Sequence, residues 1–141
     1  MFQTVLVPLD GSKLAEKSLT YVENLAKEGS IAEVIFLNVV EIPSMWLSKG
    51  FNISSLKNEL SHRAQRYLAD IESRFKSKGL KIRTEILEGE AAQCIVEQAK
   101  KLAVDLIVIG THGYTGMKGV VFGSVALKVL HDSHIPVLLI R

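Results

Sequence analysis

The feature that most constrains the fold of this chain is a regular alternation of short apolar runs with amphipathic helical patterns. Five runs have the length and the β-branched content of strands, and they cover residues 4–9, 34–40, 80–86, 106–109 and 135–140. Apolar residues at helical spacing fall between these runs, in segments 15–26, 56–75, 90–103 and 125–130. Strands that alternate with helices predict a parallel sheet with right-handed crossovers and helices on both faces.

The five apolar runs differ in the burial that they predict. Runs 4–9 and 34–40 are almost entirely apolar, which is typical of parallel strands covered on both faces. Run 80–86 instead alternates apolar residues such as Ile82 with charged residues such as Arg83. A period of two indicates a half-exposed strand, so we expect this strand at an edge of the sheet.

The helix boundaries carry their own signals. Ser12 stands where the N-cap of the first helix is expected, and Gly29 and Gly79 follow the first and second helical patterns as stops. Segment 41–55 has no clear period and contains Pro43, so we expect a loop there that is mobile or acts as a lid.

A glycine-rich segment follows the fourth strand and leads into the last helix. Five of its residues are glycine, namely Gly110, Gly113, Gly116, Gly119 and Gly123. Glycine allows a ligand to approach the main chain closely, and the unpaired N–H groups of a helix's first turn attract anions. With Ser124 at the expected N-cap, this segment predicts a phosphate-binding site.

Two well-known phosphate motifs do not fit this segment. The Walker pattern needs a Lys directly before the Ser or Thr, and no Lys directly precedes Ser124. The glycines at 110, 113, 116 and 119 recur every third residue, which excludes the dinucleotide fingerprint. The pattern that fits is G-x2-G-x9-G-[ST], formed by Gly110, Gly113, Gly123 and Ser124. This pattern after a strand resembles the nucleotide-binding signature of the universal stress protein family. The segments TVLVPLDGS, VIFLNVV and HIPVLLIR are also similar to that family.

The resemblance implies a fold for the whole chain. The family has a three-layer, doubly wound α/β domain of the adenine nucleotide alpha hydrolase-like type, which would span residues 1–141. Its five parallel strands have the order 3-2-1-4-5, which places the first and fourth strands side by side. Asp10 follows the first strand and Gly110 ends the fourth, so both would lie at the switch point where such sheets bind ligands.

The resemblance also implies how ATP, or AMP or ADP, would bind. Adenine would lie over Pro8 and Val39, the ribose near Asp10, and the phosphates on the backbone of residues 110–116 and the start of the last helix. A Mg or Mn ion bound with ATP would also lie near Asp10. Many nucleotide-binding relatives have a hydroxyl residue in place of Ala126, so one polar contact is missing here. The implied contacts are Pro8, Asp10, Val39, Gly110, Thr111, His112, Gly113, Tyr114, Thr115, Gly116, Gly123, Ser124, Val125 and Ala126.

Several of these residues also have a purely structural interpretation. Asp10 belongs to an L-D-G-S sequence that is typical of turns, and Pro8 and Val39 are ordinary strand residues. A single loop His without an adjacent nucleophile is more often a hydrogen-bonding residue than a base, so we assign no catalytic role to His112. Lys118 is equally consistent with a phosphate contact and with a solvated side chain.

Bulk properties limit the partners. A chain of 141 residues with 48% apolar residues and a net charge of +2 is typical of one globular domain, and no basic run exceeds two residues. We therefore expect neither nucleic acid nor a membrane as a partner, and we expect a cytoplasmic protein. The single Cys94 is interpreted as a small packed apolar residue.

The sequence leads to one preferred function and two alternatives. The resemblance implies an ATP-binding universal stress protein that acts as a nucleotide-dependent regulator or a stress-survival factor. It also implies a homodimer, because the apolar last strand would form an unpaired sheet edge and relatives associate along that strand. The alternatives are a slow ATPase or self-phosphorylating enzyme, and an interaction module that needs no nucleotide.

Overall fold

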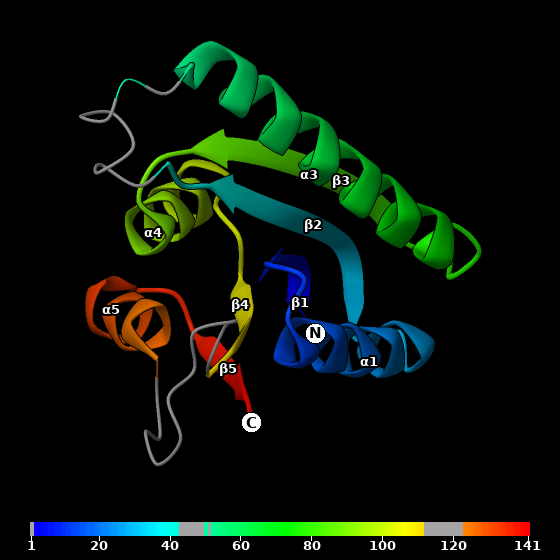
Figure 1. Cartoon of the computed structure of the whole chain (residues 1–141). Coiled ribbons are helices and arrows are strands. Elements are labelled where there is room, and N and C mark those ends of the chain that lie inside the picture. The colour runs from blue at the N-terminus through cyan, green and yellow to red at the C-terminus, as the bar shows by residue number, and fades with distance from the viewer. Residues whose placement is uncertain (1, 43–49, 51, 112–122) are drawn as a thin grey trace.

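A five-stranded parallel sheet with helices on both faces forms the single α/β domain of this protein (Figure 1). The computed structural model describes residues 2–42, 50, 52–111 and 123–141. The strand order β3-β2-β1-β4-β5 is the order that the family resemblance implied, so the predicted fold class is confirmed. The elements are β1 (Phe2–Pro8), α1 (Lys13–Lys27), β2 (Ile31–Val40), α3 (Ile53–Phe75), β3 (Lys81–Glu88), α4 (Ala91–Lys101), β4 (Leu106–Gly110), α5 (Ser124–Asp132) and β5 (Val137–Ile140).

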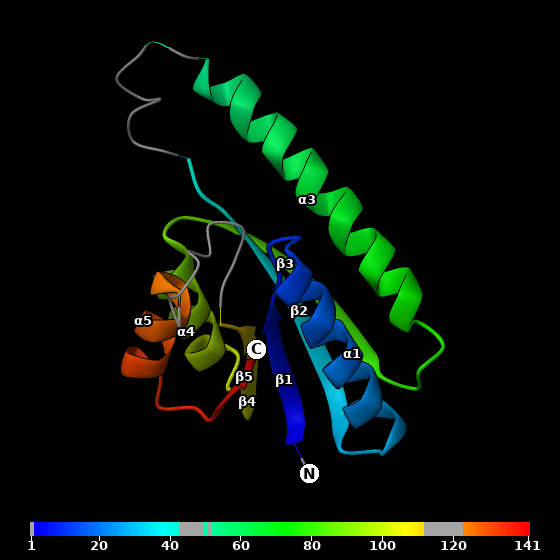
Figure 2. The same cartoon turned by 60° about the horizontal axis from the view of Figure 1, so that its bottom comes forward.

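The sheet has one apolar core on each face. Helices α1 and α3 cover one face, where Phe36 and Phe75 pack with their ring centroids 5.0 Å apart, and α4 and α5 cover the other (Figure 2). Strands β1, β2 and β4 alternate their side chains between the two cores, so their central residues are completely buried. Such double coverage explains why these strands are apolar at nearly every position.

The predicted helix caps of the first half of the chain are largely confirmed. Ser12 is the N-cap of α1, and its Oγ accepts a hydrogen bond from the Ala15 amide at 3.2 Å. Gly29 and Gly79 follow α1 and α3 with φ angles of +70° and +74°, a backbone conformation that favours glycine.

The loop predicted over 41–55 is longer than the structure allows. Helix α3 begins at Ile53, because the side chain of Asn52 accepts a hydrogen bond from the Ser55 amide at 3.2 Å and caps the helix there. Residues 43–49 and 51 lie outside the described part of the chain, so the expected mobility or lid role stays a prediction.

The two edges of the sheet are β3 and β5. The edge position of β3 confirms the prediction from its alternating sequence, and Arg83 and Glu85 form an ion pair of 3.0 Å on it. At the amino ends of the strands, the carboxylate of Asp105 accepts hydrogen bonds from the amides of Gln3 and Thr4, both at 2.9 Å. Among the described residues, no helix is long and apolar enough to cross a membrane.

Candidate functional site

The carboxyl ends of β1 and β4 lie next to each other in the middle of the sheet. The two strands pair in parallel, with Val5 opposite Leu106 and Leu6 opposite Ile107. Strand β1 ends at Pro8 and β4 ends at Gly110, so the turn that contains Asp10 and the start of the glycine-rich segment leave the same edge of the sheet. This is the switch point at which ligands bind in doubly wound sheets.

The two ends of the glycine-rich segment are held together at this edge. The amide of Gly123 donates a hydrogen bond to the carbonyl of Thr111, and the Thr111 amide donates to the carbonyl of Ile140 at 2.9 Å. Thr111 is only 2% exposed. The start of α5 is therefore fixed directly beside the end of β4, although twelve positions separate the residues that join them.

The first turn of α5 differs from the prediction in one respect. Gly123, not Ser124, is the N-cap, because the Leu127 amide donates to the Gly123 carbonyl at 3.0 Å as the first hydrogen bond of the helix. Ser124 is the first helical residue. Gly123 has no side chain that can cap the helix, so the predicted attraction of this helix end for an anion is retained.

The neighbouring helix at the same edge of the sheet is different. The carboxylate of Glu41, which follows β2, accepts a hydrogen bond from the Ala91 amide at the start of α4. Glu90 is the N-cap of α4 and forms an ion pair of 3.0 Å with Lys128 of α5. Carboxylates therefore occupy the start of α4, and the start of α5 is the better place for a phosphate.

Asp10, Gly11 and Ser12 form the turn between β1 and α1. The sequence left two interpretations of Asp10, a structural turn residue and a ligand contact. Oδ1 of Asp10 accepts a hydrogen bond from the Ser12 amide at 2.9 Å, which confirms the interpretation as a turn residue. The Asp10 side chain is nevertheless exposed at the switch point. Contact with a ligand stays a prediction, and it is compatible with the bond that Asp10 makes within the turn.

Two residues that the sequence interpretation missed hold this turn from the side. Nδ2 of Asn38 in β2 donates to the carbonyl of Leu9 at 2.8 Å, and the hydroxyl of Tyr67 in α3 accepts from the Gly11 amide at 3.1 Å. A signal for each was present. Asn38 is a polar residue inside an apolar strand, and Tyr67 adjoins the apolar stripe of its helix with a polar end.

The two residues predicted to line an adenine pocket are half-buried strand residues. Pro8 ends β1 opposite Leu37, and Val39 lies opposite Leu87 and packs against the core on the α4 side. The interpretation of Val39 as a packing residue is thus confirmed, and adenine contact by either residue stays a prediction. In the first turn of α5, Val125 is exposed and Ala126 is only 2% exposed.

The other predicted contacts lie outside the described residues. They are His112, Gly113, Tyr114, Thr115 and Gly116, and Lys118 lies outside them as well. In the part of the chain that is described, no three His, Cys, Asp or Glu side chains cluster in a way that could hold a metal ion. The expected divalent ion at Asp10 stays a prediction, and Mg²⁺ commonly takes part of its oxygen ligands from a bound phosphate.

Comparison with known proteins identifies relatives of this chain. The model of the universal stress protein family matches residues 1–141. The chain is 35% identical to universal stress protein MJ0531 of Methanocaldococcus jannaschii, an alignment that covers 100% of this chain and 83% of the relative. It is 34% identical to universal stress protein YxiE of Bacillus subtilis, with 100% of both chains covered. The solved structure of protein MJ0577 of M. jannaschii superimposes with a TM-score of 0.89 at 31% identity, over 99% of this chain and 96% of that one.

Two more distant solved structures share the fold and contain nucleotides. One is a universal stress protein in complex with cAMP, at 24% identity and a TM-score of 0.73, over 99% of this chain and 97% of that chain. The other is a universal stress protein family member from Arabidopsis thaliana with AMP bound, at 14% identity and a TM-score of 0.70, over 98% of this chain and 90% of that one.

Proposed function

We propose that this chain, which belongs to the universal stress protein family, binds an adenine nucleotide at the carboxyl ends of β1 and β4. ATP is the preferred ligand of the proposal, and AMP or ADP would occupy the same place. The protein would act by binding: its nucleotide-bound state would be read by partners or would support survival under stress.

One observation carries the proposal: the hydrogen bond from Gly123 to Thr111 fixes the start of α5 beside the end of β4. The amides at the start of α5 then lie at the switch point, beside the end of β4, the strand that pairs with β1 and so neighbours the Asp10 turn. A phosphate that accepts hydrogen bonds from these amides gains about 1.5–3 kcal/mol from each. A few such bonds are enough for micromolar affinity, which corresponds to about −8.2 kcal/mol.

The remaining parts of the nucleotide have natural places along the same edge. The ribose would lie near Asp10, and adenine would lie against Pro8 and Val39, which are half-buried and apolar. The cAMP and AMP complexes of the two distant family members support an adenine nucleotide as the ligand class.

A divalent ion would bind only together with the nucleotide. The exposed carboxylate of Asp10 offers the hard oxygen ligand that Mg or Mn prefers, and nucleotide phosphates would complete the coordination. The ion would offset phosphate charge at the site. We assign it no part in a reaction.

Two measurements test the proposal. Purified protein is denatured and the released small molecules are identified by mass spectrometry, and emptied protein is titrated calorimetrically with ATP, AMP and GTP. We expect adenine nucleotide in the released fraction and micromolar binding of ATP, with weaker binding of GTP. Absence of heat at millimolar ATP would refute the proposal, because a site of micromolar affinity is saturated well below that concentration.

We also propose that the protein forms a homodimer through β5. The carbonyls of Pro136 and Ile140 accept hydrogen bonds from the amides of Ile107 in β4 and of Thr111 directly after it, so these two carbonyls point toward β4. Because successive residues in a strand point their backbone groups to opposite sides, Val137 and Leu139 present theirs to the outer edge. An exposed edge strand with apolar side chains is a template for a second strand, and pairing about a two-fold axis closes the assembly at two chains.

Leu138 offers a sharp test of this interface. Leu138 is 37% exposed at the edge, whereas Val137 and Leu139 are partly buried against the core, so a charge on either of those would destabilise the fold as well as the interface. We expect light scattering to give twice the chain mass of 15.5 kDa for the wild type and a monomer for Leu138→Lys. Thr84→Lys, at an exposed position of the opposite edge strand β3, is the control and should stay dimeric. A monomeric wild type, or a Leu138→Lys dimer, would exclude this interface.

A further inference from the structure

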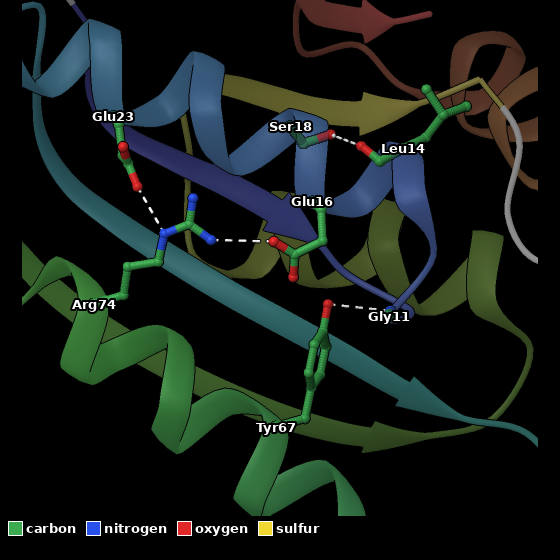
Figure 3. A network of polar contacts seen from close by, with 7 residues as sticks. All are labelled: Gly11, Leu14, Glu16, Ser18, Glu23, Tyr67 and Arg74. Carbon is green, nitrogen blue, oxygen red and sulfur yellow. Dashed lines mark hydrogen bonds and ion pairs between the residues drawn. The ribbon is translucent and has the colours of Figure 1, made fainter.

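The hydroxyl of Tyr67 reaches from α3 to the backbone of the Asp10 turn. It accepts a hydrogen bond from the Gly11 amide at 3.1 Å, across 56 residues of sequence (Figure 3). We propose that Tyr67 is a positioning residue of the nucleotide site, which holds the Asp10 turn in the shape that the ligand requires. This inference rests on the proposed function and adds to it a residue from a helix that forms no other part of the site.

The turn needs external support because of its backbone conformation. Gly11 has a φ of +82°, a conformation open to glycine, and glycine is also the residue with the most freedom to leave it. Three hydrogen bonds restrain consecutive parts of the turn: from Asn38 to the Leu9 carbonyl at 2.8 Å, from Gly11 to Tyr67, and from Ser12 to Asp10 at 2.9 Å. Of these three bonds, the one to Tyr67 is made by a residue outside the sheet and the turn itself.

The geometry indicates what this restraint does to Asp10. The Asp10 carboxylate is bonded to the Ser12 amide, so the direction of the side chain follows the orientation of the peptide unit at Gly11 and Ser12. Tyr67 fixes the amide of Gly11, the residue between them. Loss of the Tyr67 hydroxyl would therefore release the turn and let the carboxylate leave its position at the switch point.

A second contact, made by Arg74, holds helix α3 against α1. Arg74 lies about two helical turns after Tyr67, on the same face of α3. Its guanidinium donates to Glu23 at 2.8 Å and to Glu16 at 3.1 Å, and both acceptors belong to α1, the helix that the turn precedes (Figure 3). Partial burial disfavours the charge of Arg74, but the two carboxylates outweigh this effect and raise the pKa of the guanidinium. Tyr67 and Arg74 thus hold one helix against both the turn and the helix that follows it.

The test removes one oxygen atom. Tyr67→Phe keeps the ring and its packing, and Tyr21→Phe makes the same change at a tyrosine of α1 that is 45% exposed. Both variants and the wild type are titrated with ATP by calorimetry. We expect Tyr67→Phe to bind ATP about three- to tenfold more weakly, as loss of one net hydrogen bond predicts, and Tyr21→Phe to bind as the wild type does. In an NMR spectrum of the nucleotide-free protein, the Gly11 amide resonance should shift in Tyr67→Phe alone.

A double-mutant cycle separates positioning from general stability. If Tyr67 acts through the turn, Tyr67→Phe should weaken ATP binding in the wild type but cause almost no further loss in an Asp10→Asn background. A stability effect unconnected with Asp10 would reduce affinity by the same factor in both backgrounds and would overturn the inference.

The remaining outcomes are also decisive. Wild-type binding with unchanged affinity in Tyr67→Phe would overturn the inference and leave the proposed function intact. Wild-type binding that Asp10→Asn does not weaken would overturn it as well, because Tyr67 would have no ligand contact to position. Failure of the wild type to bind ATP would refute the proposed function itself, and the inference with it.

Discussion

Substitution of Gly123 by Val is the sharpest perturbation of the proposed phosphate site. Gly123 is the N-cap of α5, with φ of −76° and ψ of 164°. Those angles lie in the extended region that any L-residue adopts, so valine fits the backbone without strain. The new branched side chain stands at the entrance to the helix's first turn, where the phosphate would approach.

The size of the effect follows from the hydrogen bonds at this helix end. The first intrahelical bond here is donated by Leu127, so the amides of Ser124, Val125 and Ala126 precede it. If the side chain denies the phosphate two of these three amides, the loss is about 3–6 kcal/mol at about 1.5–3 kcal/mol per bond to a charged group. We therefore expect ATP affinity to fall at least about a hundredfold.

The fold should survive the same change. Valine is a poorer N-cap than glycine, and the cost is about 1 kcal/mol, which lowers Tm by a few degrees. Calorimetric titration with ATP is the assay, with thermal unfolding measured on the same samples. Gly123→Ala is the matched variant, and its smaller side chain should give an intermediate loss. Unchanged ATP affinity in a folded Gly123→Val protein would refute the reasoning, since the phosphate would then lie elsewhere.

Three further outcomes are expected. ATP hydrolysis by the purified protein should be far below about 1 s⁻¹, the low end of typical enzyme rates; faster turnover that His112→Ala abolishes would establish an enzyme instead. Asp105→Ala removes the acceptor of two β1 amides and should lower the free energy of unfolding in urea by about 1–2 kcal/mol, with a smaller loss for Asp105→Asn, which keeps one acceptor oxygen. Partial burial and the carboxylates of Glu97, Glu90 and Glu41 raise the pKa of the Cys94 thiol. The alkylation rate of Cys94 should therefore still increase above pH 9, and Glu97→Gln should shift this increase to lower pH. A rate that levels off below pH 8.5 would contradict this.

Much of the fold was predictable because its signals are local. A strand covered on both faces must be largely apolar, as residues 34–40 are with the exception of Asn38, and an edge strand can alternate, as Lys81–Glu88 does. The N-cap at Ser12 and the glycine stops at Gly29 and Gly79 are short-range backbone requirements as well. Each of these features depends on residues within a few positions of one another, so the sequence alone carries it.

The errors occurred at the starts of two helices. Ser124 is a good N-cap residue, but the hydrogen bond from Gly123 to Thr111 draws the helix start back by one position. At α3, the cap formed by Asn52 starts the helix three residues before the apolar stripe becomes visible at Leu56. An apolar pattern marks which face of a helix is buried, and it does not mark where the helix begins.

By itself, the sequence determined that Asp10 and Gly110 lie at the carboxyl ends of parallel strands, because such ends all meet at one edge of the sheet. The family resemblance implied that these two strands are neighbours, and the pairing of β1 with β4 confirms it. Only the tertiary structure decided which side chains support that edge. Glu41 reaches the start of α4 across 50 residues, and Tyr67 reaches Gly11 across 56. These bonds require a donor and an acceptor from separate elements to meet within about 3 Å. Such a meeting depends on how the helices pack on the sheet, a property that no periodicity along the chain encodes.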